Sequence, residues 1–113
     1  MEITDMSQKT VPFLVERALE ELGYNIRKAR VRRNISLKDM SERLGIHRSV
    51  LADVENGKPG TSIAAYAGML WAMDLLQDLQ AVADPAHDSH GLALASREER
   101  ERASSPRGMD NDF

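Results

Sequence analysis

The segment MSERLGIHRSVLADVENGK, from Met40 to Lys58, has the residue types that bind a polyanion. Its Arg43, Arg48 and Lys58 side chains can pair with phosphates, and Ser49 can donate or accept a hydrogen bond. The expected chemistry is therefore noncovalent recognition rather than bond making. The segment also contains acidic residues, and the whole chain has a formal net charge of -3. Whether the segment can bind a polyanion therefore depends on where the excess acidic residues lie along the chain.

Charge is divided into three blocks along the chain. Residues 22–58 have 9 basic and 4 acidic side chains, whereas residues 1–21 have 2 and 5, and residues 59–113 have 4 and 9. A basic block between two acidic flanks is more informative than the overall charge, although a solvated helix face would have a similar composition. The distribution favours a polyanion site in the middle of the chain.

Length and composition limit the class of protein. The 113 residues suit one small domain with a tail, and the absence of cysteine excludes disulfides, thiolate zinc sites and a cysteine nucleophile. We find neither a signal peptide nor an apolar run long enough for a membrane helix. We therefore expect a soluble, cytoplasmic protein that does not contact a membrane.

The apolar spacing predicts an all-α fold, with helices over about 11–33, 36–44, 47–56, 62–73 and 74–83. We expect a flexible N-terminus at 1–10, a five-helix domain at 11–83 and a flexible polar tail at 84–113. Within the tail, the alternating Gly91 to Ala95 segment could form a short edge strand. Trp71 is expected in the core or at a dimer interface.

Two of these predicted helices have the residue pattern of a helix-turn-helix motif. Counting from Leu37, the motif needs a small fifth residue, a glycine at the ninth position and apolar residues at five further positions. The chain meets all seven requirements, with Ser41, Gly45, Met40, Leu44, Ile46, Leu51 and Val54. This joint match is strong evidence for the motif.

Residues 22 to 76 resemble the Xre/Cro repressor-type helix-turn-helix domain. The resemblance rests on the motif above, on Arg30 and Ser36, and on the closing sequence Glu55-Asn56-Gly57. It implies a repressor-like five-helix domain in which Arg30 and Glu55 form a structural ion pair. That role explains an acidic residue inside the basic block.

The resemblance implies that the second motif helix reads DNA in the major groove with its N-terminal residues. Its outward positions, and hence the candidate base contacts, are Arg48, Ser49, Ala52 and Asp53. Arg48 can bind guanine bidentately, and Asp53 can accept from cytosine or hold its neighbours. The candidate phosphate contacts are the Leu37 amide and Lys38, Arg43, His47, Asn56 and Lys58. For each cation, simple solvation is the alternative.

Three residues depart from the family pattern. Leu37 stands where a DNA-contacting Gln is frequent, His47 replaces a Ser or Thr cap, and Asp53 adds a negative charge near DNA. These departures keep open an alternative in which the domain is a protein-interaction module that has lost DNA binding.

The implied function is transcriptional repression by a homodimer bound to double-stranded DNA at a palindromic operator. A short repressor-type domain followed by an acidic, arginine-containing tail makes the chain similar to HipB-type antitoxins, which repress their own operon and bind a HipA-like Ser/Thr kinase toxin. This resemblance covers the helical domain well and the tail more loosely. A stand-alone phage or chromosomal Xre-type repressor is the alternative.

Other candidate sites are weaker. Asp84, His87, Asp88 and His90 are metal-ligand types, but they lie in a polar linker without a rigid frame. We expect no metal, no cofactor and no enzymatic activity.

Overall fold

The computed structural model describes residues 11–104, and every regular element within that range is helical. The predicted all-α class is thus confirmed. The chain divides into two compact units, Met1–Leu79 and Gln80–Phe113, which are described separately. The expected flexible stretch 1–10 and the last tail residues, 105–113, lie outside the described range. No described helix is both long enough and apolar enough to cross a membrane.

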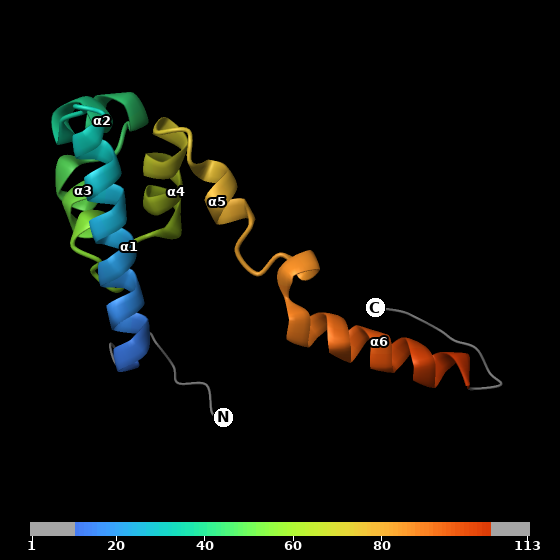
Figure 1. Cartoon of the computed structure of the whole chain (residues 1–113). Helices are drawn as coiled ribbons and strands as arrows, with labels where there is room; N and C mark the ends of the chain where they lie inside the picture. The colour runs from blue at the N-terminus through green and yellow to red at the C-terminus, as the bar shows by residue number, and fades with distance from the viewer. Residues whose placement is uncertain (1–10, 105–113) are drawn as a thin grey trace. The chain divides into compact units, whose positions relative to one another are not determined.

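The first unit is built from five helices (Figure 1). The long α1 packs against α3, while α2 and α3 pack against each other and against α4. Short turns connect α2 to α3 and α4 to α5. The helices α2 and α3, with eight residues each, are the shortest of the first four. The helices are α1 (Phe13–Arg32), α2 (Leu37–Leu44), α3 (Arg48–Glu55), α4 (Ile63–Ala72) and α5 (Leu76–Gln80).

Polar side chains and one glycine fix the helix ends. The Ser36 hydroxyl accepts a hydrogen bond from the Asp39 amide at 3.0 Å, and Ser62 caps α4 in the same way through the Ala64 amide. Gly45 ends α2 in the left-handed conformation, with φ +67, which costs a residue without Cβ nothing. The caps therefore set the lengths of the short helices.

The core lies between α1, α2, α3 and α4. Its largest fully buried side chains are Ile26, Met40, Leu51, Val54 and Met69. Trp71, by contrast, is 59% exposed, so the core alternative for this residue is wrong. A place for Trp71 at a dimer interface stays a prediction.

Two glycines let α1 and the end of α3 approach closely. A Cβ on Gly23 would lie 2.4 Å from the Val54 carbonyl oxygen and 2.6 Å from that of Glu55. Gly57, with φ +66, would place a Cβ 2.6 Å from the Cα of Glu20. Because both obstacles are backbone atoms, no side-chain rotation could make room. The two glycines thus permit a backbone contact that fixes α1 against α3.

The second unit contains the 3₁₀ helix η2 (Pro85–His87) and α6 (Ser89–Ala103). The strand expected from Gly91 to Ala95 is wrong, since α6 covers these residues. The Asp88 carboxylate caps the helix by accepting from the Gly91 amide at 3.0 Å. Leu, Ala, Glu and Arg, which follow it, are strong helix formers. A five-residue alternation is too short to outweigh these signals.

Candidate nucleic-acid interface

The turn between α2 and α3 is held by hydrogen bonds as well as by packing. The Ser41 hydroxyl donates to the Ile46 carbonyl at 2.6 Å, and the Gly45 amide donates to the Ser41 carbonyl at 2.8 Å. Leu44 and Ile46 are half-buried against the core on either side of this turn. The small side chain of Ser41 therefore ties α2 to the turn that leads into α3.

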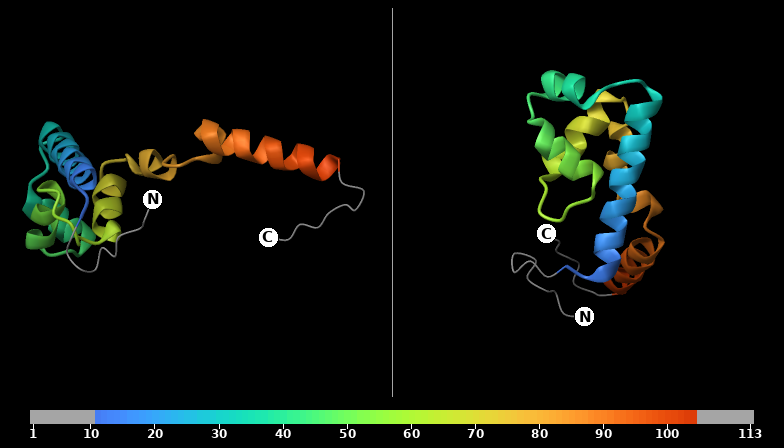
Figure 2. Two further views of the ribbon diagram at one scale, coloured as in Figure 1. Left: turned by 90° about the horizontal axis from the view of Figure 1, so that it is seen from below. Right: turned by 90° about the vertical axis from the view of Figure 1, so that its left-hand side faces the viewer.

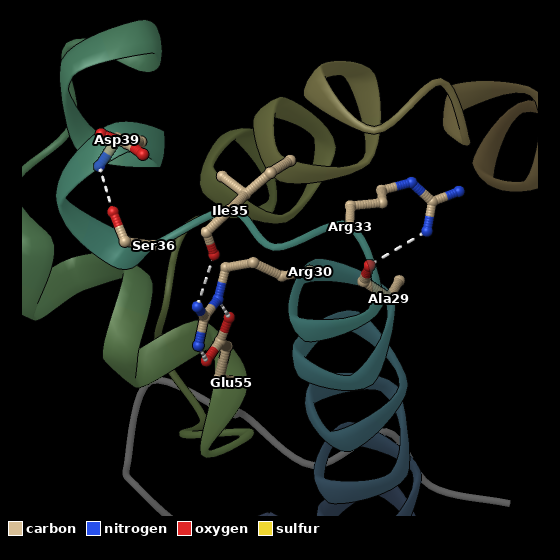
Figure 3. A network of polar contacts seen from close by, with 7 residues as sticks. All are labelled: Ala29, Arg30, Arg33, Ile35, Ser36, Asp39 and Glu55. Carbon is tan, nitrogen blue, oxygen red and sulfur yellow. Dashed lines mark hydrogen bonds and ion pairs between the residues drawn. The ribbon is translucent and has the colours of Figure 1, made fainter.

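Arg30 and Glu55 form a buried, bidentate ion pair (Figure 3). The Arg30 Nε donates to one carboxylate oxygen at 2.6 Å and Nη2 donates to the other at 3.0 Å. The two side chains are only 11% and 6% exposed. The hydrogen bond to Glu55 raises the pKa of Arg30, burial works against this rise, and the charge of Glu55 adds to it. The Arg30 guanidinium is thus held in its charged form.

The same guanidinium also reaches the segment between α1 and α2. Its Nη1 donates to the Ile35 carbonyl at 2.8 Å, as Figure 3 shows. Arg30 consequently joins α1, the start of α2 and the last residue of α3. A side chain that holds three backbone segments fixes the orientation of α3.

The residues proposed to contact bases lie on the first two turns of α3. Arg48 and Ser49 are exposed, whereas Ala52 and Asp53 are half-buried. Arg48 forms no ion pair with any described residue. Its guanidinium is therefore free to pair with an incoming anion or a base edge.

His47 caps α3 with its ring. Its Nδ1 accepts from the Ser49 amide at 3.2 Å and lies 2.9 Å from the Ser49 hydroxyl oxygen. Since an accepting nitrogen carries no proton, the neutral ring has its proton on Nε2. Nε2 is then the donor of the ring, while Nδ1 contacts both the amide and the hydroxyl of Ser49.

Asp53 has a partner that the sequence did not reveal. Its carboxylate lies 3.3 Å from the Nζ of Lys58, and its carbonyl accepts from the Lys58 amide at 3.0 Å. Both side chains remain accessible, at 40% for Asp53 and 63% for Lys58. The charge of Lys58 compensates that of the Asp53 carboxylate, which seemed the least compatible with DNA. The same pair engages Lys58, which was proposed to contact phosphate.

The other phosphate candidates lie on α2 and just after α3. Lys38 is in the first turn of α2, Arg43 in its last turn, and Asn56 caps the end of α3; all three are exposed. The Leu37 side chain packs against the core, whereas its amide belongs to the first turn, where backbone donors have no partner within the helix. The Asn56 amide donates to the carbonyl of Ala52, one of the residues proposed to contact bases, at 3.0 Å.

Comparison with known proteins gives one match. Residues 26–65 fit a protein-family model described as helix-turn-helix. This part of the chain is an Xre-type helix-turn-helix domain. Domains of this type are the DNA-binding parts of a class of transcription regulators. The matched residues contain the turn and the α3 residues described above. No curated protein and no solved structure matched the chain.

The polar residues after the helix-turn-helix domain do not assemble into a metal site. Within residues 11–104, no group of three or more His, Cys, Asp or Glu side chains is close enough to hold an ion. The Nδ1 of His87 does lie 3.5 Å from an Asp84 carboxylate oxygen, but both residues belong to one exposed turn.

Proposed function

We propose that the protein is a sequence-specific DNA-binding repressor that acts as a homodimer on a palindromic operator. The observation that carries this proposal is an exposed Arg48 at the start of α3 that pairs with no acidic side chain of residues 11–104, in a helix-turn-helix domain whose α3 is fixed by Arg30 and Glu55. Rigid positioning matters because base readout requires side chains placed to within a fraction of an ångström.

In this mechanism the N-terminal end of α3 enters the major groove. Arg48 donates two hydrogen bonds to a guanine, Ser49 reaches a base or phosphate, and Ala52 offers apolar contact. The Leu37 amide, Lys38 and Arg43 meet the phosphates on one side of the groove. Asn56 meets them on the other, Lys58 stays paired with Asp53, and His47 donates from Nε2.

Replacing Arg48 with alanine tests the proposal. With DNA from upstream of the protein's own gene, we expect Arg48→Ala to weaken specific binding by about 5- to 150-fold, since a bidentate base contact contributes about 1–3 kcal/mol. Binding to unrelated DNA should weaken far less. A gel shift over a salt series measures both effects.

Arg97→Ala is the matched control, because Arg97 is an exposed arginine on α6 and the change in charge is identical. It should leave specific affinity unchanged. If the wild-type chain shows no salt-sensitive DNA binding, the repressor proposal fails and the protein-interaction module becomes the better explanation.

The pairing of Asp53 with Lys58 leads to a second expectation. Asp53→Asn should strengthen DNA binding about threefold to tenfold, because it removes a carboxylate near phosphate and releases Lys58. The slope of log affinity against log salt should steepen by about 0.9 if the freed lysine gains one phosphate contact. Titration of labelled DNA at several salt concentrations gives both values. Weaker binding by Asp53→Asn would instead show that Asp53 itself reads a base.

A second candidate is the finer role of antitoxin to a HipA-like Ser/Thr kinase toxin. It is supported by the acidic residues that flank the domain and by the resemblance to HipB-type proteins. Co-expression with the product of a neighbouring kinase-like reading frame tests this role, which fails if no complex is recovered.

A further inference from the structure

The outer face of α1 is apolar at three exposed positions. Phe13, Tyr24 and Val31 are 69%, 56% and 53% exposed, and their spacings of eleven and seven residues place them on one side of the helix. In both views of Figure 2, this helix has a side that faces no other helix of residues 11–79. A shallow hollow among Tyr24, Arg27 and Val31 lies on this side.

Charges on α1 are divided between its two halves. Residues 13–22 include the exposed Glu16, Glu20 and Glu21 with a single Arg17, whereas residues 23–32 contain four basic residues and no acidic one. Glu20 and Glu21 therefore lie on one side of Tyr24 along the helix. Arg27 and Lys28 lie at nearly the same distance on the other side.

The helix itself does not account for these charges. A helix macrodipole favours acidic residues in the first turn and basic residues in the last, but its effect fades within one turn. Glu20, Glu21, Arg27 and Lys28 all lie further inside the helix. Among the described residues, Glu21, Arg27 and Lys28 form no ion pair, and Lys28 donates only to the Tyr24 hydroxyl at 3.0 Å.

We infer that the outer face of α1 binds the same face of a second copy of this chain, with the two helices antiparallel. A twofold axis near Tyr24 would place Glu20 beside Arg27 of the second copy, and Glu21 beside its Lys28. Symmetry doubles each pair, so four attractive contacts surround a central pair of tyrosines. In a parallel arrangement the like-charged halves would face each other.

This inference deepens the proposed function, since it gives the homodimer its interface. A pair of 20-residue helices extends over about 30 Å, which suits a modest interface. Self-association should accordingly weaken with salt, because its specific contacts are exposed ion pairs.

Charge exchange tests the inference. One full-length variant carries Glu20→Lys and Glu21→Lys, and the other carries Arg27→Glu and Lys28→Glu. Each change turns four attractive contacts into repulsive ones, so we expect each variant alone to dimerise at least about thirtyfold more weakly than the wild type. An equimolar mixture should recover dimers, because the two variants are complementary. Sedimentation at low salt without DNA measures the masses, and circular dichroism verifies that both variants remain helical.

Glu98→Lys with Glu99→Lys is the matched control, because this pair has the same charge change on the exposed surface of α6. It should leave dimerisation unchanged. The inference is overturned if the wild type stays monomeric at micromolar concentrations, if either α1 variant dimerises normally, or if the mixture recovers no dimer. It is also overturned if Trp71→Ala alone dissolves the dimer, or if Arg27→Glu with Lys28→Glu weakens DNA binding without changing the mass.

A geometric test is independent of charge. The chain has no cysteine, so Tyr24→Cys introduces a single thiol. Across a twofold axis, two such thiols should form a disulfide-linked dimer on mild oxidation. Ser89→Cys, on α6, should link far more slowly, and equal rates for the two variants would contradict the arrangement. Because these measurements contain no DNA, they can contradict the proposed interface without contradicting the proposal that the protein binds DNA.

Discussion

Gly23→Ala is expected to destabilise the helix-turn-helix domain by at least about 2 kcal/mol, although alanine is the better helix former by about 1 kcal/mol. The added methyl group would meet the Val54 carbonyl oxygen at 2.4 Å, so α1 and α3 must separate. For a domain of this size, the midpoint of thermal unfolding should fall by roughly 8–16 °C. Circular dichroism during heating measures this shift.

Gly68→Ala is the matched control within the same domain. Its Cβ would meet only Leu44 and Ile46 side-chain atoms, at 3.5–3.7 Å, which is ordinary van der Waals contact. Helix propensity should then dominate, and the free energy of unfolding should stay unchanged or rise by up to about 1 kcal/mol. Equal losses at both glycines would show that the close approach at Gly23 is not the cause.

Removal of either member of the buried ion pair should have the largest effect. Arg30→Met leaves the Glu55 carboxylate buried without its counter-ion, and Glu55→Leu leaves the guanidinium in the same state. Each variant should lose about 3–5 kcal/mol of folding free energy. Urea denaturation followed by circular dichroism measures the loss.

The double variant Arg30→Met with Glu55→Leu should be more stable than either single variant, because it leaves no buried charge unpaired. It should remain less stable than the wild type, since the Ile35 carbonyl loses the donor that lies 2.8 Å away. Additive losses in the double variant would contradict direct coupling between the two side chains.

Much of the fold could be predicted because its signals are local. Ser36 and Gly45 bound α2 because serine is a favourable N-cap and glycine readily takes the left-handed conformation that ends a helix. Asn34, with φ +56, takes the same conformation just after α1, as asparagine does more often than most residues. The helix-turn-helix pattern adds the relative placement of α2 and α3, because its apolar and small positions are those at which two helices contact.

The features that could not be predicted depend on contacts between residues that are separated in the sequence. Gly23 looks like a defect in the apolar spacing of α1, and only the proximity of the Val54 and Glu55 carbonyls shows why a side chain is absent. Asp53 looks like an obstacle to DNA until Lys58 is found beside it across the end of α3. The face of α1 around Tyr24 could not be foreseen either, because exposure depends on which helices pack elsewhere.

The close contact between α1 and α3 also bears on how far the cooperative folding unit extends. The family match spans residues 26–65, which excludes Gly23 and its contact with Val54 and Glu55. It equally excludes four core residues of α4 and the segment after it, Tyr66, Met69, Leu70 and Met73. The part that matches the family model is thus smaller than the part that packs together. A graft limited to the matched residues would carry the candidate DNA-contacting residues without the packing that holds α3 in place.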